Sequence, residues 1–175
     1  MRIIAGRWRG RRLKAVRGRS VRPTSDRVRE AWMAAMGPSL QGARVLDLFA
    51  GSGALGLEAL SRGAREVVFV ERARGALAVL RANVELLGAR EECSIVAGDA
   101  MTYARRLEKE AFDLALADPP YEKGLAAALL ELGHQGGFAW ELWVEHRSSE
   151  AMPQLPGLRQ RRYGDTTLTI LTRDA

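Results

Sequence analysis

The sequence predicts an α/β protein whose core is a mostly parallel, doubly wound sheet of seven strands ending in an antiparallel hairpin. From Arg44 onward, short apolar runs alternate with helical patterns, as in a chain that returns through a helix after each strand. These runs are continuous rather than alternating, which is typical of strands buried on both faces. Near the C-terminus, only Gly164 and Asp165 separate two runs, a spacing that indicates an antiparallel pair. A small basic hairpin and a helix precede the sheet.

Length and composition favour one folded unit. The 175 residues are 47% hydrophobic, which is enough for one sizeable core and short for two. No run reaches the roughly 18 consecutive apolar residues of a membrane span, and the arginine-rich start lacks a signal peptide's apolar core. We therefore expect a cytoplasmic protein with no membrane partner, and a monomer as the default state. Cys93 is the only cysteine and there are two histidines, so we expect no metal centre.

The predicted N-terminal extension, residues 1–40, begins with a basic hairpin. Its two short strands, 2–5 and 12–16, are joined by a turn through Gly6 and Gly10. The first 30 residues hold 11 of the 27 Lys and Arg but two of the 21 Asp and Glu, so their net charge is +9 and that of the rest is −3. A basic segment on a mildly acidic body indicates a polyanionic partner, with nucleic acid the leading candidate. The alternative is a merely solvated terminus, which the interleaved large apolar side chains disfavour.

A helix is expected to follow the hairpin. Pro23 and Thr24 provide its start signal, and a Gly-Pro pair at 37–38 ends it. The spacing predicts one apolar face formed by Val28, Ala31, Trp32, Ala35 and Met36. The opposite face is expected to point outward, with Arg27, Arg29 and Glu30.

In the remaining chain, residues 41–175, predicted strands and helices alternate up to the final hairpin. The strands are expected at 45–49, 67–70, 94–96, 114–117, 140–145, 158–163 and 166–172. The helices are expected from the glycine-rich turn to Arg62, from Ala73 to Leu87, and at 100–107 and 125–132. Gly63 and Gly88 stand where C-terminal caps belong.

A glycine-rich turn follows the first of these strands, at the edge where an open parallel sheet binds ligands. It reads Asp47-Leu48-Phe49-Ala50-Gly51-Ser52-Gly53-Ala54-Leu55-Gly56, which fits the dinucleotide pattern G-x-G-x-x-G. That spacing is unspecific, and a nicotinamide-binding domain or a tight turn that binds nothing would also explain it. The carboxylate of Asp47 helps to distinguish between a dinucleotide and S-adenosylmethionine as the cofactor. A dinucleotide puts a pyrophosphate on this turn, whereas S-adenosylmethionine carries ammonium and sulfonium charges and no phosphate, so an acid suits it.

Acidic residues end the next two strands. Glu71 lies 20 residues beyond Gly51, where a carboxylate can accept both hydroxyls of a ribose, and this fits either cofactor. Asp99, in the segment Gly98-Asp99-Ala100, is placed to reach an adenine amino group. An Asp before a helix is often an N-cap, and one residue can fill both roles.

The segment Asp118-Pro119-Pro120-Tyr121 follows the fourth strand and so shares a crevice with the glycine-rich turn. Two prolines stop the strand and leave carbonyl oxygens without a ladder partner. Those oxygens and the Asp118 carboxylate can accept the two hydrogens of an amino group and orient its lone pair. Tyr121 offers a flat face for a flipped base, a contact typically worth ~1 to 3 kcal/mol. The alternative is a plain strand terminator.

Together these motifs resemble those of the class I amino-methyltransferases, which are Rossmann-like and S-adenosylmethionine-dependent. The segments Met1-Arg2-Ile3-Ile4-Ala5-Gly6-Arg7-Trp8-Arg9-Gly10 and Arg22-Pro23-Thr24-Ser25-Asp26-Arg27-Val28-Arg29-Glu30 closely resemble the bacterial 16S ribosomal RNA guanine-N2 methyltransferase family. The resemblance spans essentially the whole chain. The N-terminal motif is specific to that family, whereas the others are shared with DNA and protein amino-methyltransferases. Ala5 departs from the glycine expected there, which concerns only the local turn.

The resemblance implies a reaction and a set of site residues. The enzyme is expected to transfer methyl from S-adenosyl-L-methionine to the N2 amine of one guanine in 16S ribosomal RNA, within the small ribosomal subunit or an assembly intermediate. The expected catalytic residues are Asp118, Pro119, Pro120 and Tyr121. The expected cofactor-binding residues are Asp47, Phe49, Ala50, Gly51, Gly53, Glu71, Asp99 and Ala100. The expected RNA-binding residues are Arg7, Arg9, Arg11, Arg22, Thr24, Arg27 and Arg29.

Three rival functions stay open at this level. A DNA adenine-N6 or cytosine-N4 methyltransferase uses the same tetrapeptide, but sequence-specific DNA enzymes usually carry a target-recognition region, and only about 40 residues here lie outside the sheet. A nicotinamide-dependent oxidoreductase explains the glycines but not the proline pair. A binding module without catalysis explains the basic extension alone.

Overall fold

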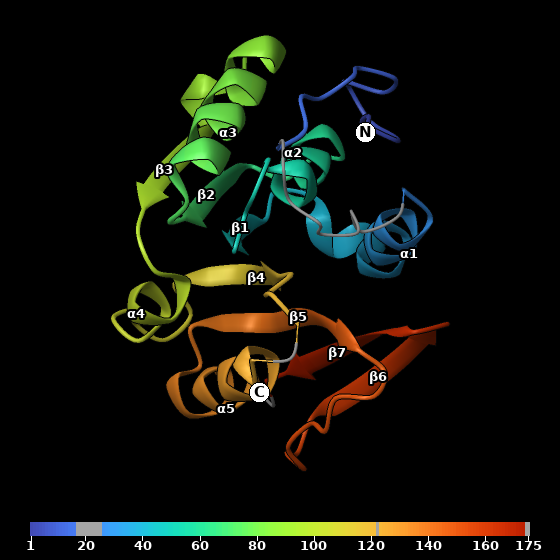
Figure 1. Ribbon diagram of the computed structural model, residues 1–175, viewed down its shortest axis with the longest axis vertical. Helices are drawn as coiled ribbons and strands as arrows, with labels where there is room; N and C mark the ends of the chain where they lie inside the picture. The colour runs from blue at the N-terminus through green and yellow to red at the C-terminus, as the bar shows by residue number, and fades with distance from the viewer. Residues whose placement is uncertain (17–25, 122, 174–175) are drawn as a thin grey trace.

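The computed structural model describes residues 1–16, 26–121 and 123–173, and its centre is one seven-stranded sheet (Figure 1). The strands are β1 (Arg44–Leu48), β2 (Glu66–Glu71), β3 (Cys93–Ala97), β4 (Phe112–Ala117), β5 (Ala139–Arg147), β6 (Leu158–Tyr163) and β7 (Thr166–Thr172). Their order across the sheet is β3-β2-β1-β4-β5-β7-β6. The pairs from β3 to β5 are parallel, and β7 runs antiparallel to both β5 and β6. The predicted mixed sheet with its C-terminal hairpin is confirmed.

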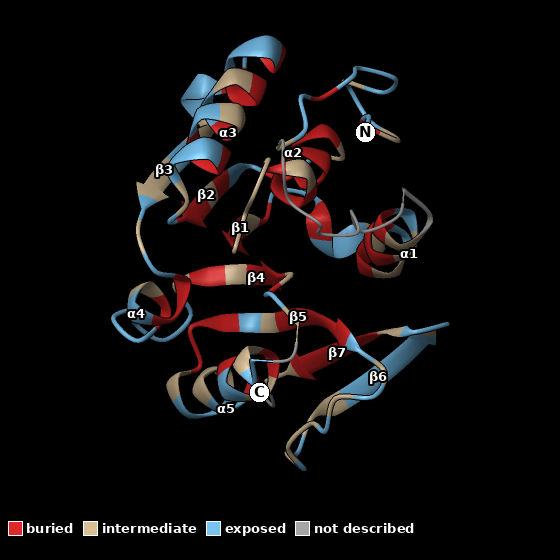
Figure 2. Cartoon of the chain, viewed as in Figure 1, coloured by how far each residue is buried: buried red, intermediate tan, exposed pale blue. Residues whose placement is uncertain are grey.

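Helices cover both faces of the sheet. They are α1 (Asp26–Met36), α2 (Ala54–Ser61), α3 (Arg74–Leu87), α4 (Ala100–Ala104) and α5 (Leu125–Gly136), with short 3-10 turns η1 (Gly37–Leu40) and η2 (Arg90–Glu92). One apolar cluster joins α1, α2 and α3 to the sheet, and a second joins α4 and α5 to the other face. Figure 2 shows the buried residues gathered along the central strands. Neighbours such as Val45 and Leu46 enter opposite clusters, which explains the continuous apolar runs.

Most predicted strand bounds differ from the structure by one or two residues, and three boundaries have a clear local cause. The first strand ends at Leu48 because Phe49 adopts a φ of +59° where the glycine-rich turn begins. Helix α4 ends at Ala104 instead of Leu107, because the next amides include bonds to carbonyls three residues back, as in a tightening turn. Helix α5 extends to Gly136, beyond the predicted end at Leu132, and stops at the left-handed Gly137.

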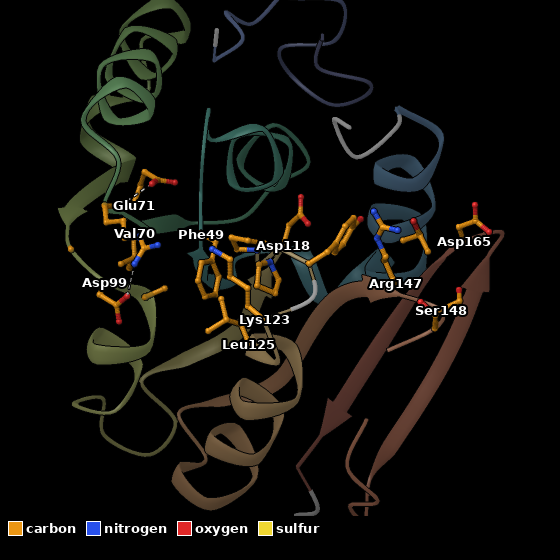
Figure 3. A pocket seen from close by; sticks show the side chains of 18 of the residues that line it. Phe49, Val70, Glu71, Asp99, Asp118, Lys123, Leu125, Arg147, Ser148 and Asp165 are labelled. Atoms are coloured by element: carbon orange, nitrogen blue, oxygen red, sulfur yellow. Dashed lines mark hydrogen bonds and ion pairs between the residues drawn. The ribbon is translucent and has the colours of Figure 1, made fainter. Parts of the chain in front are cut away.

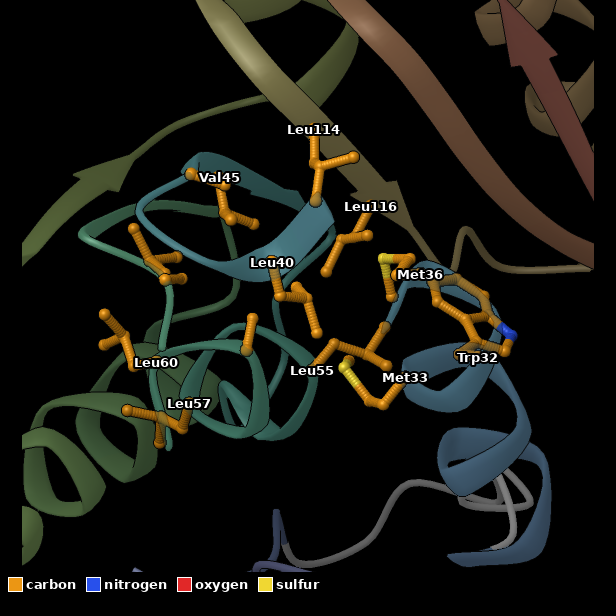
Figure 4. Close-up of a cluster of buried hydrophobic side chains, with 14 of the residues drawn as sticks. Trp32, Met33, Met36, Leu40, Val45, Leu55, Leu57, Leu60, Leu114 and Leu116 are labelled. Atoms are coloured by element: carbon orange, nitrogen blue, oxygen red, sulfur yellow. The ribbon is translucent and has the colours of Figure 1, made fainter. Parts of the chain in front are cut away.

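The predicted apolar face of α1 fixes that helix to the core (Figure 4). Trp32 and Met36 are at most 2% exposed, and they share a cluster with Leu55 of α2 and Leu116 of β4. Met33, on the flank of the predicted stripe, is also buried. Burying a side chain of this kind contributes roughly 1.5 to 3 kcal/mol, so α1 is an integral part of the fold.

The N-terminal segment, residues 1–16, forms a docked antiparallel loop whose paired region is shorter than the predicted two-stranded hairpin. Arg2 and Arg12 form one isolated antiparallel bridge, and the segment contains no extended strand. The amides of Ile4 and Ala5 donate instead to the two carboxylate oxygens of Glu58 in α2, at 2.8 and 3.0 Å. Backbone bonds still join the two sides of the segment, from the Ile3 amide to the Arg11 carbonyl at 2.9 Å and from the Leu13 amide to the Met1 carbonyl at 3.1 Å. The antiparallel pairing is therefore present, but it is shorter than predicted because the Ala5 amide binds Glu58.

Polar side chains of the body hold the rest of this segment. The Ser61 hydroxyl accepts the amide of Trp8 at 3.0 Å. Gly6 has a φ of +83° and passes so close that a Cβ atom would lie 1.7 Å from the Ser61 carbonyl oxygen, so only glycine fits. Asn83 of α3 binds both the amide and the carbonyl of Lys14, at 2.8 and 3.0 Å. The basic segment is therefore packed against the body rather than merely solvated.

Arg29 was predicted to face outward and to bind RNA, and the structure contradicts this. It is 1% exposed, its Nη2 donates to the Arg2 carbonyl at 2.5 Å, and its Nε lies 3.9 Å from the Glu58 carboxylate. The reason is electrostatic: Glu58 is fully buried, and a buried carboxylate requires charged or hydrogen-bonding partners. Arg62 supplies a second one at 2.8 Å. Glu30, predicted on the same face, is exposed.

No helix among the described residues is long and apolar enough to cross a membrane.

Candidate active site

A cavity of about 880 Å³ opens at the carboxyl ends of the parallel strands (Figure 3). This is the edge where open α/β sheets bind ligands, and the volume is within the range of small-molecule sites. The predicted residues that line it are Phe49, Glu71, Asp99, Ala100, Asp118, Pro119, Pro120 and Tyr121. The remaining predicted cofactor residues, Asp47, Ala50, Gly51 and Gly53, build the turn behind this wall and do not line it.

Amide hydrogens of the glycine-rich turn point at protein carboxylates. The Gly51 amide donates to Glu71 Oε2 at 2.8 Å, and the Gly56 amide donates to Asp47 Oδ2 at 2.9 Å. A dinucleotide-binding turn needs such amides for a pyrophosphate, and carboxylates beside them would repel that anion. Those two amides are therefore not available to a pyrophosphate, and the carboxylates beside them suit a ligand that carries positive charge.

Glu71 both builds the turn and reaches the cavity. Its Oε1 accepts the amides of Arg72 and Ala73 at 2.9 and 2.8 Å, in addition to the Gly51 bond at Oε2. An ionised carboxylate has about four acceptor positions, so Oε2 retains one for a ribose hydroxyl. The side chain is 4% exposed, and the three amides hold it in place.

Asp47 is 1% exposed and acts from behind the cavity wall. Burial raises the pKa of Asp47 to about 7, the Gly56 amide opposes that shift, and the negative charges of Asp118 and Glu71 add to it. Asp47, Asp118 and Glu71 are close enough to interact electrostatically, and their combined negative potential makes this end of the cavity favourable for a cation.

Asp99 fills the capping role that the sequence left open. Its Oδ1 accepts the Thr102 amide at 2.9 Å and the Thr102 hydroxyl at 3.0 Å, and the amide bond in particular lowers the pKa of Asp99. The carboxylate also lies 3.6 Å from Arg72, and both side chains line the cavity. The cap leaves Asp99 at the cavity wall, so both roles are compatible.

Tyr121 is held from two sides. Its hydroxyl donates to Glu145 of β5 at 2.8 Å, and the guanidinium carbon of Arg147 lies 5.3 Å from its ring centroid, within cation–π range. Burial, followed by the negative Glu145, raises the pKa of Tyr121, so the phenol stays protonated and remains a donor. The ring is thereby fixed at the cavity wall beside Asp118.

Sequence reasoning missed the residues that complete the site from the C-terminal hairpin. Glu145 and Arg147 end β5, and Arg162 and Asp165 belong to the hairpin formed by β6 and β7. Lys123, after the tetrapeptide, also lines the cavity. The position of β5 beside β4 was a usable signal, because the carboxyl ends of neighbouring parallel strands meet at one edge. The hairpin residues gave no such signal.

The predicted RNA-binding arginines of the N-terminal segment contact other parts of the body. Arg7 pairs with Glu92 of η2 at 2.6 Å, and Arg11 donates to the Leu86 carbonyl near the end of α3 at 2.8 Å. Arg9 is exposed. Three further predicted contacts fall outside the described residues or side chains: Arg22, Thr24 and Arg27.

Solved structures match this architecture over the whole chain. An Escherichia coli structure provisionally named methyltransferase yhhF superposes with a TM-score of 0.86 at 34% identity, covering 100% of this chain and 98% of that one. A 16S rRNA N2 G1207 methyltransferase from Thermus thermophilus, at 20% identity and a TM-score of 0.71, shares the fold over 90% of this chain and 45% of its own. The fold and the cavity at the strand ends thus define a Rossmann-like methyltransferase.

Sequence relatives identify the family. The family model described as Conserved hypothetical protein 95 matches residues 1–172. Ribosomal RNA small subunit methyltransferase D of Escherichia coli K12 is 33% identical, over 100% of this chain and 91% of that protein. A Bacillus subtilis protein provisionally named rRNA methyltransferase YlbH is 36% identical over 97% of each chain. The chain belongs to the family of ribosomal RNA small subunit methyltransferase D.

Proposed function

We propose that this enzyme transfers a methyl group from S-adenosyl-L-methionine to the exocyclic N2 amine of a guanine in 16S ribosomal RNA, acting in the cytoplasm on the small subunit or its precursor. One observation carries the proposal: a single cavity joins an acidic end, with Glu71 and Asp99, to an amine-accepting centre at Asp118 and Tyr121. The name of the Escherichia coli relative, a small subunit RNA methyltransferase, supports the same substrate.

The acidic end fits S-adenosylmethionine. Glu71 retains an acceptor for a ribose hydroxyl, and Asp99 lies at the cavity wall near the predicted adenine position. Asp47 and Asp118 add acidic groups on the side of the glycine-rich turn, which favours a ligand with ammonium and sulfonium charges and no phosphate. When bound, this cofactor supplies an electrophilic methyl group.

The tetrapeptide would orient the guanine amine. The Asp118 carboxylate and the Pro119 carbonyl accept its two hydrogens, which favours a more tetrahedral nitrogen whose lone pair points at the incoming methyl. Tyr121 stacks on the base, and the Glu145 bond sets the plane of its ring. Catalysis is then mainly positioning of two reactants in line.

No strong general base is required. The amine nitrogen becomes acidic as it gains the methyl group, and Asp118 or water accepts the released proton. The Tyr121 phenol does not serve as this base, because its raised pKa keeps it protonated.

One rival function explains less of the site, and a second differs only in its nucleic-acid substrate. A nicotinamide-dependent oxidoreductase needs a pyrophosphate-binding turn, whereas here the Gly51 and Gly56 amides bind carboxylates. A DNA amino-methyltransferase fits the tetrapeptide equally well, so the nucleic acid must be tested directly.

The test uses small subunits, free 16S RNA and duplex DNA, the first two from a strain lacking the enzyme. Each is incubated with the enzyme and S-adenosylmethionine labelled in its methyl group, and the modified nucleotide is mapped. The proposal expects label on the N2 atom of one guanine in subunits or free RNA, and label that accumulates about a hundredfold or more slowly with Asp118→Ala. Label on DNA alone, or on another atom, contradicts it.

A further inference from the structure

The cavity extends past Tyr121 into a region that contains no residue expected from the sequence. Its wall there is built by the end of β5 and the β6–β7 hairpin, through Arg147, Ser148, Ser149, Arg162, Asp165 and Thr166. In Figure 3, Arg147, Ser148 and Asp165 lie on the opposite side of Asp118 from Glu71 and Asp99. The cofactor and one base account for the acidic end and the centre, so this third region needs another occupant.

The charge of the cavity reverses along its length. At the acidic end, Glu71 and Asp99 outnumber Arg72. At the hairpin end, Arg147 and Arg162 outnumber Asp165, whereas Lys123 lies nearer Phe49 and Leu125 in Figure 3. The first region suits a cation and the second suits an anion. A nucleotide whose base reaches Tyr121 brings its own phosphate and that of its neighbour to the cavity mouth.

The side chain of Arg162 is well placed to bind such an anion. Its Nε donates to the Gly164 carbonyl at 3.0 Å, which holds the side chain along the hairpin. That bond uses one of the five N–H donors of a guanidinium, whose planar fork matches phosphate geometry. Arg162 belongs to β6, an edge strand that Figure 2 shows exposed along most of its length. An RNA strand can therefore reach it without displacing any of the described helices or strands.

The basic N-terminal segment is held at a different place. Helix α3 begins at Arg74, close to the cavity residue Glu71, and Arg11 contacts Leu86 thirteen residues into its fourteen-residue length. At 1.5 Å per residue, that contact lies roughly 20 Å along the helix from the cavity edge. Among the described residues, a different group is therefore needed to hold the phosphates next to the reacting base.

We propose that Arg147 and Arg162 form a phosphate clamp for the nucleotides that adjoin the target guanine, while the N-terminal segment contacts a separate part of the RNA. This deepens the proposed function and rests on it for the identity of the substrate. The clamp contacts the RNA phosphates and not the bases. Its contribution is therefore to position the target nucleotide at the cavity, without sequence specificity.

The test measures binding of a short single-stranded RNA with a central guanine by fluorescence anisotropy, over a series of KCl concentrations and with saturating S-adenosylhomocysteine. Arg162→Gln should weaken binding and reduce the log-log salt slope by roughly 0.7 for each lost phosphate contact. Asp165→Asn should strengthen binding. Affinity for S-adenosylhomocysteine, measured by calorimetry, should stay unchanged in both.

Arg159→Gln is the matched control. Arg159 lies on the same strand, but it pairs with Glu141 at 3.6 Å and Thr172 at 3.0 Å and does not line the cavity. Its salt slope should equal that of the unaltered protein. If Arg162→Gln and the double variant with Arg147→Gln also keep that slope, or if Arg159→Gln lowers it equally, the clamp is refuted. The proposed function fails separately, if the unaltered enzyme methylates no guanine N2 in 16S RNA.

Discussion

Replacing Glu58 by glutamine should loosen the N-terminal segment from the body. The fully buried carboxylate accepts the amides of Ile4 and Ala5 at 2.8 and 3.0 Å and Nε of Arg62 at 2.8 Å, with Nε of Arg29 3.9 Å away. Glutamine has the same size but offers one oxygen in place of two and no charge. One backbone amide would then face an NH₂ group, and two arginines would lose their buried counter-charge.

The expected magnitude follows from the burial. Breaking a buried pair by removing one partner costs about 3 to 5 kcal/mol. In a chain of this length, 1 kcal/mol lowers Tm by roughly 2 to 4 °C, so Glu58→Gln should lower it by roughly 6 to 20 °C. Thermal unfolding followed by circular dichroism measures this, and hydrogen exchange of the Ile4 and Ala5 amides reports the local loosening.

Glu66→Gln provides the control for that experiment. Glu66 also pairs with an arginine, Arg65 at 2.9 Å, but the two side chains are 50% and 61% exposed. Such surface pairs contribute about 0 to 1 kcal/mol. If Glu58→Gln lowers Tm no further than Glu66→Gln does, the N-terminal segment is not anchored by this carboxylate and the reasoning fails.

Other variants test the site. Glu71→Ala should weaken S-adenosylmethionine binding by about 1.5 to 3 kcal/mol in calorimetry, the range for a hydrogen bond to a charged group, and unchanged affinity contradicts the ribose contact. Burial raises the pKa of Asp47 from its ordinary 3.8 to about 7, so the contribution of Asp47 to wild-type stability should fall as pH rises between these values. The stability of Asp47→Asn relative to wild type, measured by urea unfolding, should therefore grow over that window, and a constant difference refutes the shift. Asp118→Ala should lower single-turnover methylation about a hundredfold or more with little change in RNA affinity, and a loss confined to affinity would remove it from the chemistry. Tyr121→Phe should keep more activity than Tyr121→Ala, which also loses ~1 to 3 kcal/mol of stacking, although the phenylalanine variant deprives buried Glu145 of a donor; equal inactivity of both would exclude the stacking role.

The positions of the site motifs could be predicted because each motif comes at or just after the end of a strand that the sequence already indicates. Apolar runs predicted the strands. Glu71 ends β2, Asp118 directly follows β4, and Asp99 lies two residues after β3. The carboxyl ends of such strands share one edge, so these residues had to meet there. The structure adds that Glu71 and Asp47 also hold the glycine-rich turn through its amides. That role needed three-dimensional positions.

The sequence by itself determined the order of strands and helices, the crevice and most of its acidic and proline-rich wall, since these follow from hydrophobic period and strand connectivity. Only the tertiary structure decided what the polar side chains bind. The helical spacing predicted an exposed Arg29. The side chain is buried instead, because the buried Glu58 carboxylate, 29 residues away in the chain, requires a positively charged partner. In the sequence, nothing distinguishes Arg162 from the other arginines of its strand. The antiparallel pairing of β7 with both β5 and β6 brings Arg162 to the cavity that Asp118 and Tyr121 line. Contacts between charges or strands that are far apart in the chain leave no local sequence pattern, so only the tertiary structure could reveal them.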